Sequence, residues 1–208
     1  MITLQEYLKD PCRILSIPFW KYRCISLPDH IMVVHDDVFI DGQFSARKQE
    51  SYFRLYHPLH SICSTKLDGY QILTASPSNI ADFVRIINQS YKDISVTYEQ
   101  LIDYTQTEVF MPDLWILIRN DATGEFVGGG IADLDREARE GILEWIQVLP
   151  NYRRQKIGQL IVNELLHRMQ GLADFATVSG KTSNATNPEK LYRRCGFLGN
   201  NIWHVLEK

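Results

Sequence analysis

The sequence predicts an α/β fold, and the order of its strand and helix signals carries that prediction. Residues 143–149 form an apolar run that suits a strand buried on both faces, and Pro150 ends it. Apolar side chains then recur at helical spacing through residues 157–169. Upstream, a predicted strand at 70–74 is followed by an amphipathic helix at 80–91. Strands and helices therefore follow one another along the chain, as they do in α/β proteins.

Composition and charge restrict the class of protein. The 208 residues are 45% hydrophobic and 23% charged, which is ordinary for a folded domain. The net charge of -3 gives no general attraction to nucleic acids or anionic membranes, so any phosphate must be recognised locally. Because the N-terminus carries Glu6 and Asp10 and no apolar run is long enough to span a membrane, we expect a cytoplasmic protein without a signal peptide.

The cysteines and histidines predict no metal site. The four cysteines lack CxxC spacing and have no histidines at zinc-finger intervals, so we expect reduced, mostly buried thiols. These cysteines are Cys12, Cys24, Cys63 and Cys195. His57 and His60 are three residues apart, but Pro58 between them argues against a helical ligand pair.

Residues 1–66 are expected to form an irregular N-terminal extension packed on the remaining chain. Thr3 with Glu6 is a capping-box pattern, which predicts a short helix at 4–9 that Asp10-Pro11 ends. Turn signals then separate several short extended or apolar segments. These lie at 14–20, 31–34, 38–40 and 52–56. The extension is rich in aromatic residues, which either anchor it to the core or line one wall of a substrate pocket.

The central third of the chain predicts two helices and a hairpin. Ser78 or Asn79 caps the helix at 80–91, and a Thr97–Gln100 capping box opens a second helix that ends near Thr107. Residues 114–119 and 125–133 are then predicted to be the two strands of a β-hairpin. Three glycines at 128–130 lie inside its second strand, where they indicate a bulge, a close approach of a ligand or an accommodation of packing.

The loop after the strand at 143–149 predicts an anion site. Asn151 is a candidate helix cap, and the start of the following helix presents backbone N–H groups that have no partner within the helix. Arg153, Arg154 and Lys156 add positive charge to that helix terminus. A phosphate group suits such a site best.

This loop resembles the acetyl-CoA loop of the GNAT N-acetyltransferases, which reads Gln or Arg, two residues, Gly, one residue, then Gly or Ala. Arg153 opens the motif and Gly158 closes it. Lys156 stands where the family usually has its first glycine. It can serve there if its φ is negative and its side chain turns outward.

A second match to the same family lies downstream. Asn187 as a cap and Pro188 at the first helical position predict a helix start. The family signature of Leu-Tyr, three residues and Gly-Phe then matches Leu191, Tyr192, Gly196 and Phe197. Together the two matches imply a GNAT fold, in which helices flank a mixed central β-sheet, over residues 67–208.

The resemblance implies acetyl-CoA as co-substrate and assigns its contacts. The pantetheine arm is expected to pair like an extra strand with the backbone of Ile146, Gln147 and Val148. The pyrophosphate is expected to meet the loop and first helical turn, at Arg153, Arg154, Gln155, Lys156, Ile157, Gly158 and Gln159. Asn184 or Asn187 contacts the pantetheine or orders the loop, and the spacing leaves both open.

The implied reaction needs two proton transfers. A lysine-like amine has a pKa of about 10.4, so its neutral form at pH 7 is costly, and a carboxylate acting directly or through water eases deprotonation. Glu144, on the central strand, is the best candidate for this base, and Asp133 and Glu140 are weaker ones. Tyr192 matches the family tyrosine that protonates the leaving thiolate.

The sequence therefore predicts an N-acetyltransferase that transfers an acetyl group from acetyl-CoA to an amine of a small molecule or peptide. The alternative is a non-catalytic acyl-CoA-binding module whose N-terminal extension is a partner-interaction surface. Neither hypothesis involves a nucleic acid or a membrane, and we expect a monomer or a homodimer.

Overall fold

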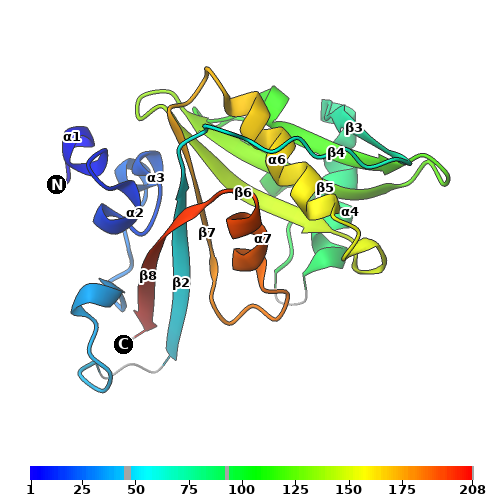
Figure 1. Cartoon of the computed structure of the whole chain (residues 1–208). Coiled ribbons are helices and arrows are strands. Elements are labelled where there is room, and N and C mark those ends of the chain that lie inside the picture. Colours follow the sequence, from blue (N-terminus) through cyan, green and yellow to red (C-terminus); the bar gives the residue numbers. More distant parts are fainter. Residues whose placement is uncertain (45–47, 92–93, 208) are drawn as a thin grey trace. The chain divides into compact units, whose positions relative to one another are not determined.

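A computed structural model describes residues 1–44, 48–91 and 94–207 (Figure 1). It divides the chain into two compact units. The first unit combines Met1–Pro58 with Thr177–Lys208, and the second consists of Leu59–Ala176. These units do not coincide with the predicted boundary at residue 66, because N-terminal and C-terminal strands pair within the first unit. The division into an extension and a catalytic domain stays a prediction.

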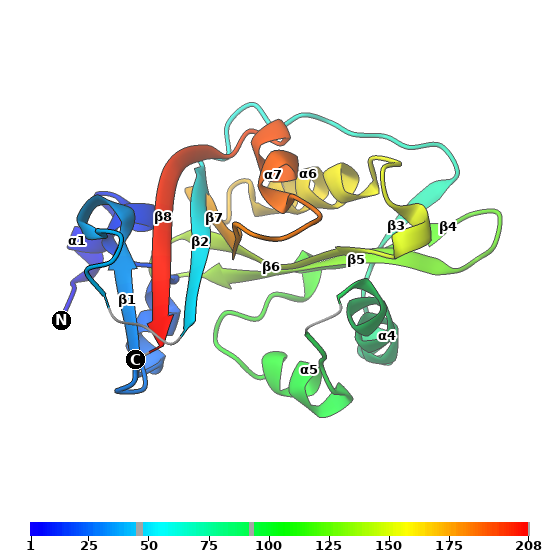
Figure 2. The same cartoon turned by 90° about the horizontal axis from the view of Figure 1, so that it is seen from below.

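The sheet of the first unit runs in the order β1-β8-β2-β7. Its strands are β1 (Ile31–His35), β8 (Leu198–Glu207), β2 (Lys48–His57) and β7 (Phe175–Lys181). Strand β8 pairs antiparallel with both β1 and β2, as Figure 2 shows for the strand drawn in red. Because β2 lies between β8 and β7, the N-terminal region supplies an inner strand of this sheet.

Three short helices precede these strands: α1 (Leu4–Tyr7), α2 (Pro11–Ile14) and α3 (Phe19–Cys24). The Thr3 capping box of α1 is present, which confirms the first predicted helix. The extended segment predicted at 14–20 is wrong, because Ile14 ends α2 and Phe19 begins α3. Asp10 caps α2, with Pro11 at its first position. Proline there has the φ that a helix start needs and loses no helical hydrogen bond.

Three other N-terminal segments have different outcomes. The segment at 31–34 lies in β1, so it is confirmed as extended. The apolar run at 52–56, which carried no prediction of secondary structure, lies in β2. The segment at 38–40 is wrong, because Asp36–Val38 forms a 3-10 turn, η1, which His35 caps through its ring nitrogen.

The second unit contains an antiparallel sheet in the order β6-β5-β4-β3. Its strands are β3 (Tyr70–Thr74), β4 (Trp115–Asn120), β5 (Phe126–Asp135) and β6 (Glu140–Val148). Its helices are α4 (Ile80–Ser90), α5 (Tyr98–Tyr104) and α6 (Ile157–Met169), with short 3-10 turns η2 (Pro77–Asn79), η3 (Pro112–Leu114) and η4 (Pro150–Tyr152). In Figure 2, α4 and α5 cover one face of this sheet and α6 covers the other. The predicted α/β class is confirmed.

The three glycines of β5 are explained by helix packing. A Cβ on Gly130 would lie 2.5 Å from Ile161 Cγ2 and 2.8 Å from Leu165 Cδ1, both on α6. A Cβ on Gly129 would lie 3.0 Å from Phe83 Cε1 on α4, on the opposite face. Gly129 and Gly130 therefore let helices approach the sheet closely on both sides, as the packing alternative predicts. A register shift opposite Ile118 and Arg119 also places a bulge beside Gly128, as the bulge alternative predicts.

Cysteine burial differs from the prediction. Cys12 and Cys195 are buried, but Cys24 and Cys63 are exposed, and none of the four takes part in a disulfide. Within the described ranges, no cluster of three or more His, Cys, Asp or Glu side chains is arranged to hold a metal ion. No helix in those same ranges has the length and apolarity needed to cross a membrane.

Candidate functional site

The loop between β6 and α6 is built around a left-handed helix start. After β6 the chain passes through η4, and α6 begins at Ile157 with Lys156 as its N-cap residue. Asn151 lies inside η4 and does not cap α6, so that prediction is wrong. Pro150 starts the 3-10 turn there, and the chain continues for four further residues before the helix begins.

Lys156 adopts a φ of +64°, and Arg154 two residues earlier a φ of +65°. The condition of a negative φ at Lys156 is therefore not met: the residue at the family's glycine position takes a glycine-like conformation. A residue with a Cβ pays about 1–2 kcal/mol for this left-handed geometry. The Lys156 side chain is exposed, as the loop requires if it is not to cover its own backbone.

The charges of this loop remain available to a ligand. Arg154, Gln155 and Lys156 are all exposed, and no ion pair of Arg154 or Lys156 is seen within the part of the chain that the structure describes. Lys156 makes no side-chain cap, and the first helical bond of α6 runs from Leu160 N–H to the Lys156 carbonyl at 3.0 Å. The N–H groups at 157–159 thus begin an uncapped helix beside exposed cations, which favours an anion.

Arg153 has a different role from its two basic neighbours. Its Nε donates to the Val148 carbonyl at 3.1 Å, and its Nη2 donates to the Ser90 carbonyl at 2.7 Å. Ser90 is the last residue of α4, whose carbonyl end carries negative potential. Arg153 therefore fixes the start of the loop against β6 and α4.

Of the β6 residues predicted to pair with pantetheine, some have backbone groups that point toward β5 and others have backbone groups that point away from it. Leu149 N–H donates to the Val127 carbonyl on β5 at 2.9 Å, and Gln147 faces Gly129 two positions earlier. In an antiparallel ladder the bonding direction alternates, so the backbone of Gln147 also points toward β5. The backbones of the residues on either side of it point to the opposite edge.

The carbonyl groups at that opposite edge accept hydrogen bonds from side chains. The Ile146 carbonyl accepts from Tyr91 Oη at 3.2 Å, and the Val148 carbonyl accepts from Arg153. Burial raises the pKa of Tyr91, and the positive charge of Arg153 opposes that rise. Ile146 and Val148, rather than Gln147, therefore have the backbone orientation that an added strand-like ligand requires.

Glu144 lies in a β-bulge. Trp145 pairs with Ile131 and Leu143 pairs with Ala132, which leaves Glu144 as an extra residue in β6. A Cβ on Gly141 would lie 2.4 Å from the sulfur of Met169, so position 141 faces α6. Alternation then directs Glu144 to the face covered by α4 and α5, and the bulge keeps the next residue on that face as well.

Trp145 confirms this orientation, because its ring lies 5.9 Å from that of Tyr91 at the end of α4. Glu144 is partly buried there. The weaker base candidates, Asp133 and Glu140, are 1% and 0% exposed. Of the three carboxylates, Glu144 is therefore the most accessible in this structure.

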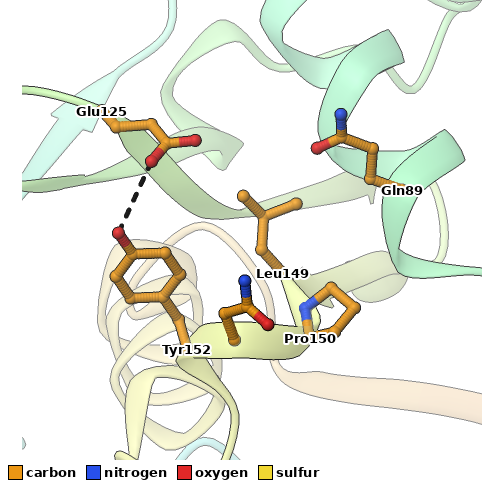
Figure 3. Close-up of a pocket in the computed structure, with 6 residues that line it drawn as sticks. Gln89, Glu125, Leu149, Pro150 and Tyr152 are labelled. Atoms are coloured by element: carbon orange, nitrogen blue, oxygen red, sulfur yellow. Dashed lines mark hydrogen bonds between the residues drawn. The ribbon is translucent and has the colours of Figure 1, made fainter.

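Sequence reasoning missed a pocket next to the loop. It has a volume of about 590 Å³, and Figure 3 shows the side chains around it. The lining residues are Gln89, Glu125, Leu149, Pro150, Asn151 and Tyr152. Tyr152 Oη donates to Glu125 at 3.5 Å across one side. The sequence placed these residues in separate predicted elements, so no local motif could have revealed this pocket.

In the first unit, the candidate asparagines order the segment that leads into α7 (Pro188–Arg194). Asn184 Oδ1 accepts from Thr186 N–H at 2.9 Å and from Thr186 Oγ1 at 2.8 Å. Asn187 caps α7 by accepting from Lys190 N–H at 3.4 Å, with Pro188 at the first helical position, as predicted. In this structure both amides therefore stabilise the turn.

Tyr192 lies on α7 and is 7% exposed. Its ring centroid is 6.1 Å from that of Phe53 and 5.7 Å from that of Phe197. Gly196, with a φ of +96°, ends the helix, because Phe197 N–H reaches the Tyr192 carbonyl and Gly196 N–H the Arg193 carbonyl. This double closure is a Schellman motif, so the predicted C-cap is confirmed and explains the family's Gly-Phe spacing.

Comparisons with known proteins agree with this arrangement. Residues 112–198 match the family model described as the acetyltransferase (GNAT) domain. The GCN5-related N-acetyltransferase from Sphaerobacter thermophilus is similar in structure, with a TM-score of 0.67 and 19% identity over 77% of this chain and 51% of that one. The chain thus spans about half the length of that protein.

Two further solved structures give similar values. A GNAT-family acetyltransferase from Colwellia psychrerythraea has a TM-score of 0.60 and 15% identity over 78% of this chain and 58% of its own. The ribosomal-protein-S18-alanine N-acetyltransferase from Escherichia coli has a TM-score of 0.54 and 16% identity over 66% and 92%. No curated protein matches the sequence significantly. At these identities the structures support the fold alone, and they confirm the predicted GNAT fold.

Proposed function

We propose that this chain, which matches the GNAT acetyltransferase domain over residues 112–198, is an acetyl-CoA-dependent N-acetyltransferase that acts on an amine of a small molecule or peptide. The observation that carries the proposal is the loop between β6 and α6. It combines an uncapped helix start, exposed Arg154 and Lys156, and an adjoining strand edge where Ile146 and Val148 point away from β5. That combination suits a ligand with a pyrophosphate and an amide-containing arm.

In the proposed reaction, the neutral amine nitrogen forms a bond to the thioester carbonyl carbon and the C–S bond breaks. Glu144 takes the proton that the amine loses, directly or through a water molecule. Tyr192 gives a proton to the departing thiolate, a part proposed from its position in the Leu-Tyr and Gly-Phe signature. A phenol has a pKa near that of a thiol, so this transfer has little energetic cost.

The proposed cofactor residues are of two kinds: those that contact the pyrophosphate and those that hold the surrounding chain in place. Arg154, Gln155, Lys156, Ile157, Gly158 and Gln159 surround the pyrophosphate through backbone N–H groups and charge. Arg153 acts by holding the loop, because its guanidinium is already bonded to two carbonyl groups. Asn184 and Asn187 act by ordering the chain before α7.

Calorimetric titration with acetyl-CoA tests the cofactor site. We expect micromolar binding by the wild type and loss of binding in Arg154→Glu, which reverses a charge, and in Gly158→Trp, which fills the helix start. A folded wild type that fails to bind would refute the enzyme proposal and leave the extension's role as a partner surface to be tested.

A panel of amines, read out by release of free thiol, tests the transfer itself. Tyr192→Phe should lower turnover while acetyl-CoA binding persists, and Glu144→Gln should lower turnover most at neutral pH, where the amine needs a base. Unchanged turnover in Tyr192→Phe would remove that residue from the mechanism.

A further inference from the structure

One face of β6 carries polar groups that the fold itself does not use. Leu149 and Trp145 lie on the face covered by α4 and α5, where both belong to the apolar cluster around Phe83 and Ile87. Gln147 lies between them on the same face, because side chains alternate along a strand. Gln147 is 2% exposed, so its amide is enclosed by this apolar layer.

The Gln147 amide lacks hydrogen bonds at both ends. Neither Oε1 nor Nε2 has a partner among the residues that the structure describes, and the same is true of Trp145 Nε1. A buried polar group without a partner costs about 1–3 kcal/mol. Leu or Met would fill this place without that cost, so an amide here is unfavourable for the fold alone.

The next residue on this face of β6 reaches the pocket of Figure 3. That residue, Leu149, lines the pocket together with Gln89 from the last turn of α4. In the other direction along β6, the bulge places Glu144 on this face next to Trp145. Along one strand face, the pocket-lining Leu149 is therefore followed by an amide, an indole N–H and a carboxylate.

We propose that Gln147 and Trp145 determine acceptor specificity by binding an uncharged amide group of the acceptor amine. This inference rests on the proposed acetyltransferase function and names its substrate class. Gln147 offers one donor and one acceptor, and Trp145 Nε1 offers one donor. An uncharged amide complements all of them, whereas a charged group would be enclosed without a counter-ion in an apolar layer.

The spacing along β6 agrees with such a substrate. Glu144 and Gln147 are three positions apart, which corresponds to about 7–10 Å between their Cα atoms in a strand with one bulge. A primary amine separated from an amide by one or two carbon atoms can reach both side chains. The substrates that test this are glycinamide and β-alaninamide, with n-propylamine and n-butylamine as controls in which an ethyl group replaces the carboxamide.

The first measurement compares kcat/KM for these amines in the wild type and in Gln147→Met, an apolar side chain of similar shape. Intrinsic differences in amine reactivity cancel when the amide-to-alkyl ratio is compared between the two proteins. We expect the ratio to fall at least tenfold in Gln147→Met, as the loss of one to two hydrogen bonds predicts. An unchanged ratio overturns the proposal.

A second measurement needs no activity. The indole N–H signal of Trp145, one of four tryptophans, is assigned in a ¹H–¹⁵N spectrum by its absence in Trp145→Phe, and acetamide is titrated as the probe. A shift in the wild type that Gln147→Met abolishes supports the site even if no amine is acetylated, which separates this inference from the proposed function. No shift at millimolar acetamide overturns it.

The thermal stability of Gln147→Met distinguishes a structural role. If the amide serves a ligand, the variant melts at or above the wild-type temperature, because an unpaired polar group has been removed. A lower melting temperature together with an unchanged substrate ratio means that Gln147 holds an enclosed water for the fold, and the proposal is then wrong.

Discussion

Replacing Lys156 by glycine should stabilise the protein, although glycine usually destabilises a folded chain. Lys156 has a φ of +64°. Releasing a side chain from that conformation gains about 1–2 kcal/mol. Glycine loses about 0.5–1 kcal/mol through the greater freedom of the unfolded chain. The difference is a net stabilisation of about 0.5–1 kcal/mol, or a rise in melting temperature of about 1–4 °C for a chain of this size.

Gln155→Gly is the matched control, because its residue adjoins Lys156, is equally exposed and does not have a positive φ. Glycine there gains no relief of strain and removes the exposed hydrogen bond that Tyr70 Oη donates to Gln155 Oε1 at 2.7 Å, so we expect a loss of at least about 0.5–1 kcal/mol. Thermal and urea unfolding of both variants and the wild type at the same ionic strength give the two differences directly.

The reasoning is refuted if Lys156→Gly destabilises the protein as much as Gln155→Gly does. That result would mean that the left-handed conformation is not retained at position 156, and that the loop resembles the family pattern in sequence alone. A stabilised variant would show that the lysine is kept at the expense of stability, as expected of a residue with a role in binding.

Three further predictions concern the fold and the loop. Gly130→Ala should cost about 1–3 kcal/mol of unfolding free energy, because its Cβ would lie 2.5 Å from Ile161 Cγ2; in urea unfolding, Ile161→Ala added to it should cost less than the two single changes together. Hydrogen bonds, of which that from Lys181 is the strongest, hold the pKa of Glu50 at about 2. Glu50 therefore stabilises the fold above pH 4.5, and this contribution disappears as the pH falls toward 2. Glu50→Gln should flatten the profile of unfolding free energy against pH in that range, and an unaltered profile would contradict this. Arg153→Met should raise the Kd for acetyl-CoA but change the salt dependence of that Kd little, because the Arg153 guanidinium binds carbonyl groups. If Arg153→Met reduced the salt dependence as much as Arg154→Met does, Arg153 would contact the phosphates directly.

Local signals in the sequence were sufficient for many of the elements. The capping boxes at Thr3 and Thr97 open α1 and α5 where they were predicted. The Asn187-Pro188 start and Gly196 end of α7 are confirmed, because each depends on hydrogen bonds between residues a few positions apart. The hairpin of β4 and β5 was recognised for the same reason.

Local signals were misleading where two readings of one motif compete. Asp10-Pro11 was interpreted only as the end of a helix, whereas Asp10 also caps a second helix, α2, with Pro11 at its first position. In the candidate site, Asn151 looked like a cap, but the chain forms a 3-10 turn there and delays α6 until Ile157. The sequence left the φ of Lys156 undetermined, and in the loop it is positive, as it would be at a glycine.

The sequence by itself determined the order of the elements, the family resemblance, and a basic loop between a buried strand and a helix, because these depend on short-range periodicity and spacing. Only the tertiary structure decided which way the β6 side chains point. The bulge at Glu144 and the pairing of Gln147 with Gly129 depend on a neighbouring strand. A register between strands is set by packing across the sheet, so the amide face beside the pocket has no signature along the chain.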